Sequence, residues 1–441
     1  MESNRASSEK IKELYAHYLN NPSITTDSRN IKSGDIFFAL KGENFDGNEF
    51  AFKAIEQGAS LVVCDKKELK LRENFIKLRE KIFFCEDSLE TLQLLAKHHR
   101  TQLSATVIGI SGTNGKTTTK ELIQAVLSSS FKVVATKGNL NNHIGVPLTL
   151  LSIPSDTQIA IVEMGANHVG EIDFLCQIAQ PDMGILTNIG TAHIEGFGSL
   201  ENIAKTKKAL FEYVKNNSSD KAHLFVNNDD EILSLENYEK KTTYSINKLS
   251  DIKAEATTID AYAQITYKDK TITSSLVGIY NAHNILAALT IGLHFGIEFD
   301  LIKKSIEEYI PSNNRSQILK TGKNTLILDC YNANPSSCKS AIESFANLNA
   351  ERKMIFMGAM KELGTVSESE HKAVFDLMNA KGFERIVLVG KEYQEVAEGR
   401  VEYFSSSEEL KEYLLENQIE NATILIKGSR STKMEVLKDV L

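Results

Sequence analysis

The chain of 441 residues is long enough for about three domains of the usual size, and 42% of its residues are hydrophobic against 24% charged. The 50 Lys and Arg residues and the 58 Asp and Glu residues give a net charge of −8, which argues against nucleic acid or an anionic membrane as the main partner. The polar N-terminus MESNRASSEK does not have the form of a signal peptide, and no run of about 18 apolar residues predicts a membrane span.

The first hundred residues predict a small α/β domain. Short apolar runs at residues 60–65 and 81–87 are typical of strands. An amphipathic helix is expected over residues 88–100, with Ser88 as its N-cap. Because a new strand is predicted at once, at residues 105–110, we expect residues 1–103 to form the N-terminal domain.

The middle of the chain predicts a mostly parallel sheet with helices on both faces, because its strands are apolar throughout. A Thr-rich, alternating stretch at residues 248–275 predicts an antiparallel excursion at the edge of this sheet. A helix is expected next, at residues 281–296, and the whole central domain over residues 104–311. Its buried strands are expected at residues 159–165, 183–190 and 223–228.

The C-terminal part predicts a Rossmann-like, doubly wound α/β domain over residues 312–441. The stretch IPSNNRSQ interrupts the periodicity at residues 309–316 and marks the boundary. Apolar strands then alternate with helical stretches. These strands are expected at residues 324–329, 353–358, 385–390 and 422–429.

Five cysteines are scattered along the chain and none forms a CxxC pair, so neither a disulfide framework nor a thiolate zinc site is expected. Together with the absence of a targeting signal, this predicts a cytoplasmic protein. The cysteines are Cys64, Cys85, Cys176, Cys330 and Cys338.

The clearest chemical signal is ISGTNGKTTTK at residues 110–120, where a strand runs through a glycine loop into a helix. Glycines allow backbone N–H groups to close on phosphate oxygens, and the helix N-terminus adds positive potential. Lys116 supplies a charge for the β- and γ-phosphates, and the Thr117 hydroxyl can bind Mg²⁺. The alternative is a glycine turn with a capping threonine. The predicted ATP-binding residues are Gly112, Thr113, Asn114, Gly115, Lys116, Thr117 and Thr118.

The loop departs from the strict P-loop pattern, because Ile110 stands where that pattern has its first glycine. The variant GTNGKT points away from GTPase switches. It points toward ATP-dependent ligases that join a carboxylate to an amine.

Several further stretches appear in the order typical of one family, and with them the chain resembles the Mur ligases, which build the peptide of bacterial cell-wall precursors. The resemblance covers essentially the whole chain. It implies an ATP-dependent ligase that adds D-alanyl-D-alanine to UDP-N-acetylmuramoyl-tripeptide through an acyl phosphate. The stretches are TTDSR, GDIFFALKGENFDGNEF, TKGNLNNHIGVPLTLL, VEMGANHVGEI, TNIGTAHIEGFGS, AHNILAAL, YNANPSS, GAMKELG and KGSRSTKME.

Glu163 and His193 are the candidate metal residues beside Thr117. Glu163 ends the strand in VEMG, where a carboxylate can reach a cation held by Thr117, although a solvated glutamate is the alternative. His193 follows another strand end, the usual place of ligands in open α/β sheets, and its alternative is a structural histidine. The resemblance implies that both bind metal and that the site takes two Mg²⁺ ions.

The resemblance also implies an N-carbamylated lysine four residues before a phenylalanine, as a ligand of the metal. Counting back from Phe211 gives Lys207 on the helix ENIAKTKKALFEYV. Lys205 and Lys208 lie close by, so the register stays open, and a solvated basic face is the alternative. Lys116, Glu163, His193 and Lys207 are the predicted catalytic residues.

Residues of the second half match positions that face the nucleotide in the family. An Asn can hydrogen-bond adenine with both its groups, and an Arg can stabilise γ-phosphate charge. For the YNANP segment a turn after a strand is also expected. The predicted contacts are Asn284, Arg315, Asp329, Asn332 and Asn334.

The UDP end of the substrate is assigned by resemblance to TTDSR and to residues 41–48. The predicted substrate contacts are Ser28, Arg29, Lys41, Gly42, Asn141, Asn142 and His168, with His168 as a positioning or capping residue. Two residues depart from the family pattern: Asn48 stands where a histidine is usual and Ala359 where an acidic residue is usual.

Two alternatives remain at this point. Another Mur-type ligase (adding diaminopimelate or lysine) or folylpolyglutamate synthase would use the same loop, but YNANP and GTNGKT count against them. A nucleotide-binding regulator would have no use for Glu163, His193 and Lys207 together. We expect a monomer whose partners are small molecules only. We expect the N-terminal domain to bind the UDP end, the central domain the triphosphate, and the C-terminal domain the adenine and the dipeptide.

Overall fold

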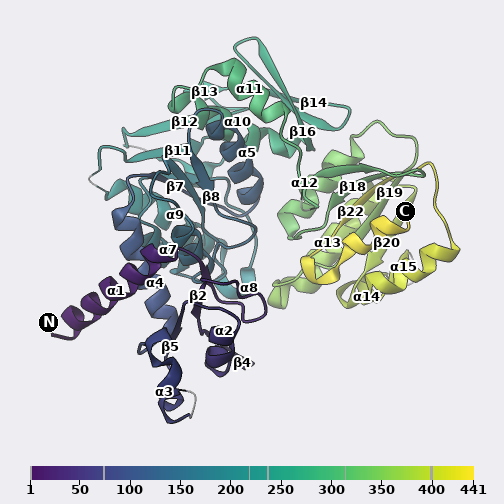
Figure 1. The fold of residues 1–441 in the computed structure, drawn as a ribbon. Coiled ribbons are helices and arrows are strands. Elements are labelled where there is room, and N and C mark those ends of the chain that lie inside the picture. The colour runs from purple at the N-terminus through teal and green to yellow at the C-terminus, as the bar shows by residue number, and fades with distance from the viewer. Residues whose placement is uncertain (1, 73–74, 218, 236–237, 313, 398–400) are drawn as a thin grey trace.

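The computed structural model describes residues 2–72, 75–217, 219–235, 238–312, 314–397 and 401–441. Figure 1 shows three lobes in chain order: purple to blue N-terminal elements, a teal central sheet, and a green to yellow C-terminal lobe beside it. The predicted α/β class with a mostly parallel central sheet is confirmed. None of the helices within these described ranges is long and apolar enough to cross a membrane.

The N-terminal lobe is built on a four-stranded parallel sheet in the order β1-β2-β5-β6. A two-stranded hairpin of β3 and β4 projects from it. The strands are β1 (Ile24–Thr25), β2 (Ile36–Phe38), β3 (Lys41–Gly42), β4 (Phe45–Asp46), β5 (Leu61–Cys64) and β6 (Ile82–Phe84), and the helices are α1 (Glu2–Asn20), α2 (Ala51–Glu56), α3 (Phe75–Leu78) and α4 (Ser88–Gln102).

Helix α4 corrects one sequence prediction, because its N-cap is Asp87 and not Ser88. Asp87 has extended backbone and its carboxylate accepts from the Glu90 N–H, while Ser88 is already helical and buried. A residue can cap only from outside the helix. Helix α4 then packs on α6 and α7 of the central lobe, and Tyr18 of α1 donates to the Leu151 carbonyl at 2.7 Å.

The central lobe holds a seven-stranded, all-parallel sheet in the order β13-β12-β11-β10-β7-β9-β8. On one face of its middle strand β7, Ile108 and Ile110 belong to the core formed with α5 and α10. On the other face, Val107 belongs to the core formed with α6, α7 and α9. Helices therefore cover both faces, as predicted. The strands are β7 (Thr106–Ser111), β8 (Val133–Ala135), β9 (Ile159–Glu163), β10 (Met183–Leu186), β11 (His223–Asn227), β12 (Lys241–Ser245) and β13 (Ile252–Lys253), and the helices are α5 (Lys116–Ser128), α6 (Gly145–Leu151), α7 (Glu171–Ala179), α8 (Ile194–Phe197), α9 (Leu200–Lys215), α10 (Ala282–His294) and α11 (Phe299–Glu307).

The Thr-rich stretch is antiparallel over most of its length, as predicted, and its first strand, β13, lies at the edge of the central sheet, where it pairs parallel with β12. The antiparallel strands that follow do not extend this sheet. Strands β14 (Glu255–Ile259), β15 (Tyr262–Tyr267) and β16 (Lys270–Val277) form a sheet of their own. Ala263, Ile265 and Ile272 are fully buried in the core that α10 and α11 share. Helices α10 and α11 thus cover the apolar face of the hairpins, so these strands bury their apolar side chains without pairing with the central sheet.

The C-terminal lobe has six strands in the order β17-β18-β22-β19-β20-β21, all parallel except β17, which sequence analysis did not predict. Helix α12 begins at Asn334, whose side chain caps it in a capping box with Ser337. The strands are β17 (Gln317–Lys320), β18 (Thr325–Asp329), β19 (Lys353–Gly358), β20 (Arg385–Val389), β21 (Glu402–Phe404) and β22 (Thr423–Lys427), and the helices are α12 (Pro335–Ala346), α13 (Ser367–Ala380), α14 (Gln394–Ala397) and α15 (Ser407–Glu416).

Candidate active site

The glycine loop lies between the middle strand β7 and helix α5, at the carboxyl edge of the central sheet. Gly112 and Gly115 both have positive φ, at 139° and 78°. A Cβ on Gly112 would lie 2.0 Å from the Thr187 hydroxyl, and one on Gly115 would lie 2.5 Å from Asn284 Oδ1. Only glycine fits at these two positions, and the N-terminus of α5, directly after the loop, is the part of a helix that favours an anion.

Lys116 folds back over the loop that precedes it. Its Nζ donates to the carbonyls of Gly112 at 2.9 Å and Thr113 at 3.0 Å. Burial lowers the pKa of Lys116, the nearby Glu163 carboxylate opposes this shift, and Arg315 adds to it. The amine is therefore held over the loop, within reach of any phosphate that binds there.

Glu163 ends β9 beside the loop and is buried, with 1% of its surface exposed. Its Oε1 accepts from Asn141 Nδ2 at 2.8 Å and from the Thr117 hydroxyl at 3.3 Å. Its Oε2 is buried and accepts no hydrogen bond, while Lys120 Nζ lies 3.7 Å away. An open carboxylate oxygen next to a hydroxyl is a donor set that suits Mg²⁺.

No group of three or more His, Cys, Asp and Glu side chains that could hold a metal ion occurs among the described residues. Mg²⁺ is usually held by one or two carboxylates, waters and substrate phosphates, and does not need an all-protein cage. Thr117 and Glu163 at a phosphate loop therefore fit a Mg²⁺ ion that arrives with a nucleotide.

Among the three neighbouring lysines of α9, only Lys207 is buried, with 2% exposed, whereas Lys205 is exposed and Lys208 is half-buried. Lys207 Nζ donates to the Gly112 carbonyl at 3.1 Å, the same oxygen that Lys116 uses. Burial, and to a smaller extent the adjacent Lys116, lower the pKa of Lys207 to about 7. The helix thus presents one lysine of the three to the loop.

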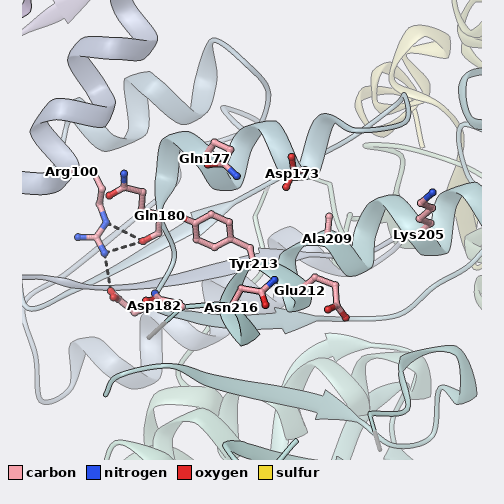
Figure 2. Close-up of a pocket in the computed structure, with 11 residues that line it drawn as sticks. Arg100, Asp173, Gln177, Gln180, Asp182, Lys205, Ala209, Glu212, Tyr213 and Asn216 are labelled. Atoms are coloured by element: carbon pink, nitrogen blue, oxygen red, sulfur yellow. Dashed lines mark hydrogen bonds and ion pairs between the residues drawn. The ribbon is translucent and has the colours of Figure 1, made fainter. Parts of the chain in front are cut away.

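Lys205, on the outer side of the same helix, lines a surface cavity of about 780 Å³ between α7 and α9 (Figure 2). The guanidinium of this cavity belongs to Arg100, which donates to the Gln180 carbonyl at 3.0 Å and to Asp182 at 2.8 Å. The Arg100 charge is therefore already compensated by Asp182 and by the carbonyl at the C-terminal end of α7. The cavity lies on the side of α9 away from the loop and Lys207.

His193 makes its side-chain contact with the C-terminal lobe. It precedes α8 in left-handed conformation, and its Nδ1 pairs with the carboxylate of Glu362 from the C-terminal lobe. This hydrogen bond lowers the pKa of Glu362, which also has a positive φ of 61°. The two residues join the central and C-terminal lobes where α8 meets the segment that begins at Gly364.

A second link between these lobes involves the phosphate loop itself. Asn114 Nδ2 donates to the Ser336 hydroxyl at 2.8 Å, and Asn334 Nδ2 donates to Asn114 Oδ1 at 2.8 Å. Asn334 and Ser336 stand at the start of α12. The loop is thus held by the C-terminal lobe through both groups of one amide.

The remaining predicted nucleotide residues line this junction. The buried amide of Asn284 accepts from Thr119 and donates to Asn281, and it packs against Gly115. The Arg315 guanidinium lies 3.6 Å from the centre of the Tyr331 ring, and its buried Nε has no hydrogen-bond partner.

Two further predicted residues lie at the end of β18 in the C-terminal lobe, Asp329 as its last residue and Asn332 three positions later. Asp329 pairs with the buried Lys427 at 2.7 Å. Asn332 Oδ1 accepts from the Ala333 N–H at 2.9 Å. Both side chains therefore have partners within their own lobe.

The predicted contacts for the UDP end are solvent-facing. Arg29 is 85% exposed and pairs with Asp27 at 2.8 Å, next to the half-buried Ser28. Lys41, beside Gly42 on the hairpin, pairs with Asp65 at 2.8 Å.

Three predicted substrate residues have other contacts. Asn141 donates to Glu163, and Asn142 Oδ1 accepts from the Gly145 N–H at 2.9 Å, just at the start of α6. His168 is exposed and its backbone N–H donates to Glu171. Asn48, the departure from the family pattern, is fully buried and bonds both the backbone and the carboxylate of Asp65.

Sequence reasoning missed three residues of this region: Lys120, Ser336 and Glu362. Lys120 follows Thr117 by three positions in TTTK, so helical spacing could have placed the two on one face. Glu362 belongs to GAMKELG, but its contact with His193 spans 169 positions of sequence and has no local signal.

The fold and the site together define a phosphate-binding α/β enzyme whose loop is covered by a second lobe. Models of three Mur ligase domains match the chain: the Mur ligase family catalytic domain over residues 22–100, the Mur ligase middle domain over 110–292, and the Mur ligase glutamate ligase domain over 314–430. The chain belongs to the Mur ligase family.

Relatives match over nearly the full chain. UDP-N-acetylmuramoyl-tripeptide–D-alanyl-D-alanine ligase of Bacillus subtilis is 33% identical over 435 residues, covering 95% of this chain and 93% of the relative. MurF from Acinetobacter baumannii has a TM-score of 0.83 at 29% identity, covering 95% and 92%. MurF ligase from Thermotoga maritima in complex with ADP has a TM-score of 0.82 at 26% identity, covering 95% and 97%.

Proposed function

We propose that the chain is an ATP- and Mg²⁺-dependent ligase that joins D-alanyl-D-alanine to UDP-N-acetylmuramoyl-tripeptide in peptidoglycan precursor synthesis. The printed activity of the Bacillus subtilis relative supports the substrates. The observation that carries the reaction type is the orphaned Oε2 of Glu163, buried beside Thr117 and a loop that holds Lys116.

An amide does not form from a carboxylate and an amine in water without activation. The terminal carboxylate of the tripeptide attacks the γ-phosphorus, the bond to the β-phosphate oxygen breaks, and an acyl phosphate and ADP result. The amine of the dipeptide then attacks the acyl carbon, and the tetrahedral intermediate loses phosphate. Lys116 stabilises the charge of the first step, and the covering C-terminal lobe excludes water that would hydrolyse the acyl phosphate.

Two Mg²⁺ ions, when bound, supply positive charge between the two anionic substrates. We assign one to Thr117 and Glu163 and the second to a carbamate on Lys207 and the Nε2 atom of His193, whose Nδ1 stays paired with Glu362. Carbamylation needs a neutral amine, which adds to CO2 and gives up one proton. A pKa of about 7 leaves much of Lys207 neutral near physiological pH, which supports this assignment.

Each lobe takes one part of the substrates in this proposal. Residues 1–103 bind the UDP end through Arg29 and Lys41, residues 104–311 bind the triphosphate and metals, and residues 312–441 bind the adenine and the dipeptide. The reaction takes place in the cytoplasm, and one chain acts as a monomer.

The test is acceptor choice. The purified protein receives ATP, Mg²⁺ and UDP-N-acetylmuramoyl-tripeptide, and phosphate release is compared with D-alanyl-D-alanine, diaminopimelate, lysine, D-glutamate or no acceptor. We expect release with the dipeptide at least about tenfold above every other arm. Equal release with every acceptor, above the release without acceptor, would overturn the assignment of the dipeptide. Equal release with and without an acceptor would favour a nucleotide-binding regulator.

A further inference from the structure

Lys120 of α5 is one of three lysines whose side chains are fully buried among the described residues, with Lys207 and Lys427. The proposed reaction gives it no task. A buried ammonium is costly unless a carboxylate and hydrogen bonds compensate it. Lys427 has Asp329 for this purpose, and the carboxylate nearest to Lys120 is that of Glu163.

One threonine fixes both members of this pair. Lys120 Nζ donates to the Thr136 carbonyl at 2.7 Å, and the Glu163 N–H donates to the Thr136 hydroxyl at 2.9 Å. The Lys120 ammonium and the Glu163 backbone therefore share an anchor at Thr136, directly after β8, the strand next to β9. Neither the ammonium nor the Glu163 backbone can shift far without breaking a hydrogen bond to Thr136.

The pair is close but does not form a hydrogen bond. Lys120 Nζ lies 3.7 Å from Glu163 Oε2, and that oxygen accepts from no donor, while the other oxygen is held by Asn141 and Thr117. Lys120 thus supplies positive charge to the carboxylate without occupying the oxygen on its own side. Lys116 is the other cation that faces Glu163.

We propose that Lys120 is a positioning residue of the cation site. It compensates the Glu163 carboxylate when no cation is bound, so that the oxygen stays in place and open, and it weakens cation binding by repulsion, so that the cation can leave with the product nucleotide. The identity of the cation as Mg²⁺ rests on the proposed function. Lys120 acts through Glu163 and contacts no substrate.

The first test is the Mg²⁺ dependence of stability in Lys120→Met, which keeps the length of the side chain and removes its charge. Thermal unfolding of the full chain, with ADP present at a fixed concentration, is followed in EDTA and across a titration of MgCl2. We expect Lys120→Met to melt well below the wild type in EDTA, and Mg²⁺ to restore much of the loss. The Mg²⁺ concentration for half-maximal stabilisation should fall about tenfold, because the repelling charge is gone.

The matched control is Lys132→Met, the same exchange at an exposed lysine that pairs with Asp156 at 2.5 Å. It should melt as the wild type does and show the wild-type Mg²⁺ dependence. If Lys120→Met has the same Mg²⁺ dependence as the wild type and the control, Lys120 is only a packing residue and the proposal is wrong.

A double variant keeps the proposal testable if Lys120→Met does not fold. Lys120→Met with Glu163→Gln removes both charges, so in EDTA it should be more stable than Lys120→Met alone and should not respond to Mg²⁺. A double variant that is no more stable than the single one would overturn the charge argument. None of these measurements uses the UDP substrate or the dipeptide, so failure of the ligase assignment and failure of this proposal are told apart.

Discussion

The carboxyl edge of the central sheet and the N-terminal lobe both carry the charges that a phosphorylated substrate requires, but they hold them in opposite ways. Glu163 and Lys207 are 1% and 2% exposed and are fixed by neighbours in the loop and sheet. Arg29 and Lys41 have side chains 85% and 55% exposed, each paired with an adjacent aspartate. The central edge is set before any ligand arrives, whereas in the proposed function Arg29 and Lys41 would exchange these aspartates for the ligand.

This difference predicts different consequences of mutation. Removing a buried charge changes both the reaction and the free energy of unfolding, because the remaining partner is left in low dielectric. Removing an exposed charge changes binding alone, since an exposed ion pair is worth about 1 kcal/mol or less.

Lys116→Met should have the largest effect on activity. Loss of the cation that stabilises phosphoryl transfer is expected to lower kcat by about 10²–10³-fold. Phosphate release in the presence of all substrates measures this, with Lys132→Met as the control that should keep wild-type kcat. A loss below about tenfold would mean that the loop does not hold the reacting phosphate.

Lys207→Met should abolish most activity and yet stabilise the fold near pH 7. The pKa of Lys207 is about 7 in the folded chain and near 10.4 when unfolded, so between these values the unfolded state binds more protons and wild-type stability rises with pH. The variant lacks this penalty, and its advantage, about 4 kcal/mol at pH 7, should shrink as the pH approaches 10.

Urea unfolding at several pH values in buffers free of CO2 measures this advantage. A gain that does not change with pH would contradict the burial of an ionisable amine. Lys207→Ala adds a second reading, because short carboxylic acids should restore part of its activity if a carbamate is the working group.

Glu362→Gln should lower kcat/KM for the dipeptide about five- to tenfold, because it weakens the bond that holds the C-terminal lobe on His193. KM for ATP should change less. Glu384→Gln, which disturbs an exposed pair with Arg352 in the same lobe, is the matched control and should leave both constants unchanged. Equal losses in the two variants would show that the His193 contact has no part in catalysis.

Arg29→Ala should have the smallest effect. We expect KM for the UDP substrate to rise about two- to fivefold, with kcat and thermal stability unchanged, because only an exposed pair with Asp27 is lost. Steady-state kinetics at two salt concentrations measure it. A fall in kcat would place Arg29 nearer to the reaction than its exposure indicates, and would remove the contrast between the two regions.

The features of this molecule that could be predicted from sequence are those determined by residues close together in the chain. Apolar runs located the longer buried parallel strands, and GTNGKT located the phosphate loop. The short or polar parallel strands β1, β2, β8, β12, β13 and β21 were not predicted. The cap of α4 was misplaced by one residue, because Asp87 and Ser88 are equally good caps by type and differ only in backbone conformation. The separate sheet β14–β16 could not be predicted, because its formation depends on which of its faces the helices α10 and α11 cover. No local sequence pattern determines this contact.

The same limit applies to the site. Gly112, Thr117, Glu163 and Lys207 were chosen by motif or resemblance, and the structure brings all four to one edge. Lys120 and Glu362 act through partners 43 and 169 positions away, where pairing depends on the complete fold.

The amide of Asn114 has a consequence for inhibition. It belongs to the phosphate loop, yet Ser336 and Asn334 of the C-terminal lobe hold both its groups. Thermodynamic linkage requires that docking of this lobe change nucleotide affinity by the same factor by which the nucleotide changes docking. A compound that binds between Asn114 and α12 and separates the two lobes would therefore weaken ATP binding without entering the phosphate site. ATP would in turn lower the affinity of the compound by the same finite factor, so a high ATP concentration would not displace it completely.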